Sequence, residues 1–163
     1  MEVESAVRRY LLTDPTLTAY VGNRIYIDRL ETPVAPLGLR ALVLYRATGW
    51  AETETYEGAA GEFPTLVIDC WADNTRTADG EILRTDRLSN SRAVWRAAHR
   101  LLHNPRRGQI WGATSSNPGL LVNTSSLWFH ATSIETGHRT GIPLGEAGIT
   151  TATYALHVAN LVA

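Results

Sequence analysis

The fold of this chain is decided by one stretch, Thr65-Leu66-Val67-Ile68-Asp69-Cys70-Trp71-Ala72-Asp73. A period of two residues is typical of a β-strand and sends successive side chains to opposite faces of a sheet. One face of this strand is entirely apolar and consists of Leu66, Ile68, Cys70 and Ala72, whereas the other mixes Val67 and Trp71 with the carboxylate of Asp69. The pattern therefore predicts a strand in a sheet that helices cover on one side only.

Three segments have helical periodicity. Apolar residues recur at spacings of three and four over roughly residues 2–13, which predicts an amphipathic helix. Asp14-Pro15 has the form of an N-cap followed by proline at the first helical position, and this second helix is expected to end at Gly22-Asn23. A third helix is predicted over Arg87–His103, and Asn104-Pro105 ends it.

Four further strands are predicted, over residues 24–28, 41–46, 127–134 and 150–159. A single domain of residues 1–163 is expected, because one core serves a chain of this length. Its fold class is α+β, with a mostly antiparallel or mixed sheet of four to five strands and two to three helices on one face. Long loops are expected at 49–64, 106–126 and 137–148, the last as a mobile hairpin connection, and residues 77–81 as an irregular insertion.

Composition excludes several classes of function. The net charge of −1 implies no general attraction to nucleic acid or to an anionic membrane. No apolar run approaches the roughly 20 residues of a membrane span, and the acidic start of the sequence is not expected to be a secretory signal. Cys70 is the only cysteine, which excludes a disulfide framework and a thiolate cluster. All 15 basic residues are arginine, so a P-loop lysine and a Schiff-base lysine are excluded as well.

Candidate catalytic groups do not converge in the sequence. His99 and His103 have the i, i+4 spacing of helical metal ligands, but Arg100 stands where the zincin motif has its glutamate. Both histidines are expected on the polar face of the third helix, where neighbouring arginines would repel a cation. Asp69 is expected on the exposed face of the sheet. No catalytic residue, metal ligand or cofactor is predicted, and a small metal-dependent hydrolase using these three residues is kept as an alternative.

The segregation of charge indicates a partner. Arg92, Arg96 and Arg100 repeat at i, i+4, and like charges at this spacing repel each other when they are unpaired. Residues 47–75, by contrast, contain six acidic residues and no basic one. Solvation, phosphate binding and pairing with the carboxylates of a neighbouring copy all stay open for the arginines, and the last permits head-to-tail assembly into a ring. The candidate inter-subunit or tube contacts are Glu52, Glu54, Glu57, Arg92, Arg96, Arg100, Arg106, Arg107 and Trp111.

Several short motifs follow one another in a fixed order, ending with an amphipathic helix and two strands. They are Val3-Glu4-Ser5-Ala6, Asp14-Pro15-Thr16-Leu17, Val21-Gly22-Asn23-Arg24-Ile25-Tyr26, Ala41-Leu42-Val43-Leu44-Tyr45 and Ile68-Asp69-Cys70-Trp71-Ala72. This ordered set resembles the tail terminator, or tail completion, proteins of long-tailed bacteriophages. The resemblance extends from Val3 to about Val158, and the long loop at 106–126 departs from it.

The resemblance implies a structural virion protein without enzymatic activity or cofactors. Such proteins form a homohexameric ring that caps the head-proximal end of the tail tube, ends tube polymerisation and joins the tail to the head connector. The implied partners are further copies of the chain, the tail tube protein and the head–tail connector protein. DNA is expected to pass through the lumen without sequence-specific binding. The expected location is the neck region of the virion, after assembly in the host cytoplasm and without a membrane. A head-side connector or a minor tail protein is the alternative.

Overall fold

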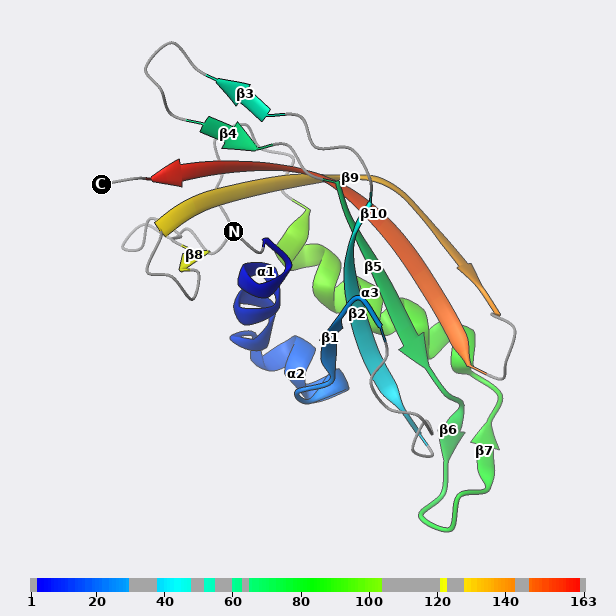
Figure 1. Ribbon diagram of the computed structural model, residues 1–163. Coiled ribbons are helices and arrows are strands. Elements are labelled where there is room, and N and C mark those ends of the chain that lie inside the picture. Colours follow the sequence, from blue (N-terminus) through cyan, green and yellow to red (C-terminus); the bar gives the residue numbers. More distant parts are fainter. Residues whose placement is uncertain are drawn as a thin grey trace.

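The computed structural model describes residues 3–29, 38–47, 52–54, 60–62, 65–103, 121–122, 128–142 and 147–161, and these residues form an α+β fold (Figure 1). The helices are α1 (Val3–Leu12), α2 (Pro15–Val21) and α3 (Arg87–Leu102). The strands are β1 (Ile25–Ile27), β2 (Arg40–Ala47), β3 (Glu52–Glu54), β4 (Ala60–Glu62), β5 (Thr65–Ala72), β6 (Thr75–Arg76), β7 (Ile82–Arg84), β8 (Leu121–Val122), β9 (Trp128–Gly141) and β10 (Gly148–Leu161).

One mixed sheet organises the fold. Its main strands follow the order β1-β2-β5-β10-β9, and only β1 and β2 run parallel. Strand β4 pairs with the last part of β10, on the same side of β10 as β5, and β3 pairs with β4. Strand β8 pairs with β9. The predicted fold class is therefore confirmed, with five predicted strands and three short ones that the sequence did not indicate. Strands β6 and β7 form a separate two-stranded sheet.

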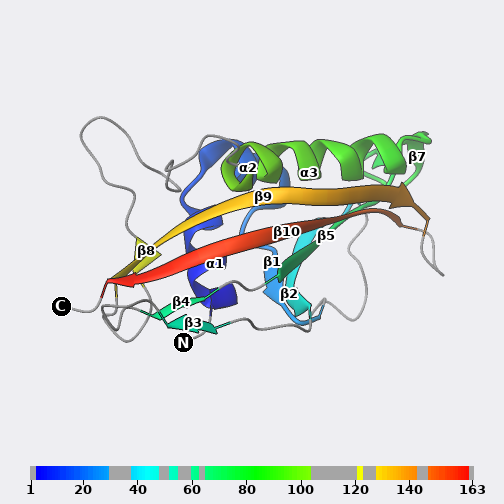
Figure 2. The same ribbon diagram turned by 90° about the horizontal axis from the view of Figure 1, so that it is seen from above.

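The core lies between β5 and the helices. Strand β5 is paired along its whole length with β2 on one side and β10 on the other, so that Ile68 stands opposite Leu44 and Ala152. Leu66, Ile68, Cys70 and Ala72 are all buried, as the alternation predicted. Helix α3 packs against β5, β10, β9 and β2, while α1 and α2 lie beside β1 and β2 (Figure 2).

Helix boundaries follow the predicted capping chemistry. Asp14 caps α2, because its Oδ2 accepts a hydrogen bond of 2.7 Å from the backbone N–H of Leu17. Gly22 ends the helix with a φ of 60°, a conformation that glycine adopts at little cost. Helix α3 begins after Asp86 and ends before Asn104-Pro105, also as predicted. In the described part of the chain, each helix is too short or too polar to cross a bilayer.

The predictions of two loops were wrong in part. Residues 49–64 were expected to be a loop, but they contain β3 and β4. Residues 137–148 were expected to be a mobile connection, whereas β9 continues to Gly141 and β10 starts at Gly148. Glycine is tolerated in these strands because pairing between β9 and β10 satisfies the backbone groups. Of the predicted loop 106–126, only β8 belongs to the described residues.

Candidate interaction surfaces

The arginine row of α3 does not form one continuous solvent-exposed ladder. The Nε of Arg92 donates a hydrogen bond of 3.3 Å to the Oγ1 of Thr140 on β9. Arg100 forms an ion pair with Asp14, the residue that caps α2. Two of the three arginines therefore have a partner within the chain, and only Arg100 among them forms an ion pair with a described carboxylate. Their role in contacts between subunits stays a prediction.

A hollow lies between α3 and the end of β9, and we call it the arginine hollow because Arg92 and Arg96 of α3 line it. Its volume is about 320 Å³, and its lining residues are Arg92, Trp95, Arg96, His138, Arg139 and Thr140. The Trp95 ring stacks on His138 with 4.2 Å between the ring centroids. Among the described residues that line the hollow there is no carboxylate, although Glu135 lies next to it and pairs with His138 at 2.8 Å. The guanidinium groups of Arg92 and Arg96 suit an anion.

The two histidines predicted on a solvated helix face are packed instead against β9 and β10. The rings of His99 and His103 stack with 4.7 Å between their centroids. The Nδ1 of His99 lies 2.9 Å from the Tyr154 hydroxyl and 3.2 Å from a carboxylate oxygen of Glu135. The backbone N–H of Glu135 donates to the Nδ1 of His103 at 3.1 Å. The prediction was wrong because β9 crosses this face of α3.

Burial of His99 makes stability depend on pH. Desolvation lowers the pKa of His99 below 6.5, with the nearby charges of His103 and His138 adding to the effect and Glu135 opposing it. An unfolded chain therefore takes up this proton at a higher pH than the folded protein does. The stabilising contribution is complete above pH 6.5 and is lost as the pH falls below that value.

We expect the urea unfolding midpoint to fall between pH 7.5 and pH 5, and to fall less in a His99→Gln variant. Asp73 and Asp86 do not contribute to this change in stability, because the pKa of each lies below 3.8 and both carboxyl groups stay ionised between pH 7.5 and pH 5. An equal fall in the midpoint of both proteins would contradict the assignment to His99.

Asp69 lies on the face of the sheet that points away from α3. It was expected to be solvated, but it accepts hydrogen bonds from the Tyr45 hydroxyl at 2.9 Å and from the Thr151 hydroxyl at 2.7 Å. Burial, followed by the charge of Asp69, raises the pKa of Tyr45 to about 12. His99, by contrast, packs on the helix side of the sheet. The three residues of the hydrolase alternative are thus separated by the sheet.

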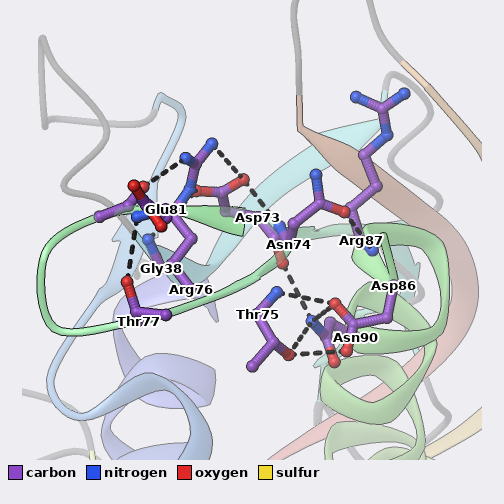
Figure 3. Close-up of polar contacts among 11 residues, drawn as sticks. Gly38, Asp73, Asn74, Thr75, Arg76, Thr77, Glu81, Asp86, Arg87 and Asn90 are labelled. Atoms are coloured by element: carbon purple, nitrogen blue, oxygen red, sulfur yellow. Dashed lines mark hydrogen bonds and ion pairs between the residues drawn. The ribbon is translucent and has the colours of Figure 1, made fainter. Parts of the chain in front are cut away.

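Residues 77–81, predicted as an irregular insertion, form the turn of a braced hairpin whose strands are β6 and β7 (Figure 3). Arg76 donates to Asp73 at 2.6 Å, and the Thr75 hydroxyl donates to Asp86 at 2.6 Å. Burial alone would raise the pKa of Asp73, but hydrogen bonds from Arg76, Gly38 and Asn74 outweigh it and lower that pKa. The hydrogen bond from the Thr75 hydroxyl is the main cause that lowers the pKa of Asp86.

Two large apolar side chains are exposed on this hairpin. Ile82 and Leu83 in β7 are 54% and 59% exposed. Sequence reasoning missed them, although the signal was present as an adjacent apolar pair within a polar segment. An exposed apolar pair on a braced arm is a candidate for contact with another protein.

The described residues define a small α+β protein whose surface carries the arginine hollow and the braced hairpin β6–β7. Among these residues, no group of three or more His, Cys, Asp or Glu side chains is arranged to hold a metal ion. No protein-family model matches the sequence, and no curated protein matches it significantly.

A solved structure shares the fold over almost the whole chain. It is a chain from the virion of a native gene transfer agent particle, with a TM-score of 0.54 and 18% sequence identity. The match covers 96% of this chain and 94% of that chain. The two proteins therefore share their overall fold along nearly their entire lengths.

Proposed function

We propose that this protein is a structural component of a phage-like virion that forms a ring at the head-proximal end of a tail tube. The observation that carries the proposal is the likeness, over 96% of the chain, to a chain of a gene transfer agent virion. The ordered motifs that resemble those of tail terminator proteins support a position at the end of a tail tube. In this role the protein ends tube polymerisation and joins the tail to the head connector, without catalysing a reaction.

The contacts in such a ring involve both charged regions of the chain. The acidic region 49–62 contributes Glu52 and Glu54, which belong to β3, and Glu57, which lies outside the described residues. The basic region contributes the arginines of α3. Arg106, Arg107 and Trp111 in segment 106–126 also lie outside the described residues and are proposed contacts to the tube or to a neighbouring subunit.

Assembly of the purified protein tests this function. We expect sedimentation velocity at several protein concentrations to show a closed oligomer, and electron microscopy to show rings. When the protein is added to the tube protein of the same virion, tubes should stop growing and carry a ring at one end.

Two other outcomes have distinct meanings. Rings that bind head particles but leave tube growth unchanged would favour the head-side connector role. A protein that stays monomeric at every concentration and does not bind tubes would contradict the proposal.

A further inference from the structure

We propose that the arginine hollow is a carboxylate-binding site that receives the acidic β3–β4 ribbon of a second copy of this chain. This inference rests on the proposed function, because it names the contact that would join neighbouring subunits in the ring. It assigns the hollow a ligand class, the side-chain carboxylate, and a source, the segment that contains Glu52, Glu54 and Glu62.

The side chains of the hollow are arranged to bind an anion. Arg92 is positioned by its hydrogen bond to Thr140, and Arg96 forms no ion pair with a described carboxylate. Guanidinium groups are planar and bind carboxylates through two parallel hydrogen bonds. The stacked rings of Trp95 and His138 form one wall of the same hollow, and the Nδ1 of His138 lies 2.8 Å from a carboxylate oxygen of Glu135. A carboxylate that enters the hollow would therefore meet the guanidinium groups of Arg92 and Arg96.

The β3–β4 ribbon has the complementary charge. Residues 47–75 contain six acidic residues and no basic one, and three of the acids lie in β3 and β4. Glu52 and Glu62 occupy the same register position on the two paired strands. The ribbon therefore concentrates acidic residues on two paired strands, and its charge is opposite to that of Arg92 and Arg96.

The two patches lie at opposite ends of the sheet. Strand β4 pairs with β10 at Val158 and Ala159, whereas Thr140 of the hollow pairs with Thr150 at the other end of β10. Eight residues separate Thr150 from Val158, which is about 26 Å of extended strand. Figure 1 shows the ribbon at the upper left and the end of β9 at the right-hand side.

One copy therefore cannot place its own ribbon in its own hollow, and a second copy can. A contact between different patches on identical chains is heterologous, and it closes into a ring when the rotation between copies allows it.

The composition of the chain favours a protein carboxylate over nucleic-acid phosphate. The net charge is −1 and the isoelectric point is near 6.5, so the protein as a whole does not attract a polyanion. A local hollow that matches a local acidic ribbon does not need such general attraction. DNA phosphate is accordingly treated as an outcome of the test.

A charge-exchange experiment tests the contact. Arg96→Glu and Glu54→Arg are prepared separately, and the concentration of half-assembly is measured for each by sedimentation velocity at low salt. Each variant alone should need at least about tenfold more protein to assemble, because like charges would then meet in the contact. An equimolar mixture should regain most of the wild-type assembly, since each altered hollow can meet an oppositely altered ribbon.

A matched control makes the same charge change away from both patches. Arg29→Glu alters an exposed arginine after β1 and should assemble as the wild type does. Arg92→Glu is the second hollow variant and should repeat the effect of Arg96→Glu. Urea unfolding confirms that each variant is folded before its assembly is measured.

The outcomes separate this inference from the proposed function. If the wild type assembles and both hollow variants reach half-assembly at the wild-type concentration, the hollow assignment is overturned and the ring proposal stands. If the mixture does not regain assembly, the ribbon is not the occupant. If the hollow variants lose only affinity for duplex DNA, measured by anisotropy, the occupant is phosphate and the inference fails. If the wild type never associates, both proposals fall.

Discussion

The Ile68→Ala variant is expected to lose about 3–4 kcal/mol of unfolding free energy. Ile68 is fully buried in the middle of β5, opposite Leu44 and Ala152, and belongs to the cluster that the helices cover. Removing three carbon atoms at such a site forfeits their transfer free energy and leaves a cavity that close-packed neighbours fill only in part. The total free energy of unfolding of a domain is only about 5–15 kcal/mol, so this loss is a large fraction of the total.

An identical change at an exposed strand position provides the control. Ile134 in β9 is 52% exposed, and Ile134→Ala should cost under about 1 kcal/mol, mostly through β-propensity. Urea unfolding of both variants followed by circular dichroism measures the difference. Equal losses at the two positions would mean that Ile68 does not lie in the core.

The Gly148→Ala variant is expected to lose about 2–3 kcal/mol, which corresponds to roughly 5–10 °C in Tm for a domain of this size. A Cβ at Gly148 would lie 2.5 Å from the carbonyl oxygen of Arg87 and 2.7 Å from its carbonyl carbon. These are backbone atoms in the first turn of α3, so they cannot rotate away. The backbone N–H of Arg87 is also held by Asn74 at 3.1 Å, which resists a retreat of the helix.

Gly141 serves as the matched control in the strand next to Gly148. A Cβ at Gly141 would meet no atom within 4 Å, and its backbone needs no positive φ. Gly141→Ala should therefore leave the Tm unchanged or raise it slightly, because alanine restricts the unfolded chain more than glycine does. Thermal unfolding of the two variants tests whether α3 and β10 approach as closely as the structure shows.

Much of the fold was predictable from local sequence patterns. The alternation around Ile68 identified the buried face of β5, and all four of its apolar members are buried. Asp14-Pro15 and Gly22 marked the ends of α2, because capping depends on groups within one turn of each other. Such features need no knowledge of the rest of the chain.

The extent of the strands was less predictable. Gly137 and Gly141 read as loop residues, but pairing with β10 keeps them in β9. The braced hairpin was likewise missed, because Asp86 binds Thr75 across 11 residues rather than capping α3. Strand pairing and bridging hydrogen bonds depend on partners that sequence periodicity does not specify.

The sequence alone determined that α3 has an apolar and a polar face and that acidic and basic residues are segregated along the chain. Only the tertiary structure decided what each polar group touches. His99 meets Tyr154, Arg100 meets Asp14, and the hollow around Arg96 forms only where β9 passes α3. The physical reason is that periodicity is set by the local backbone, whereas burial and ion pairing are set by neighbours 40 to 90 residues away along the chain, which only packing brings into contact.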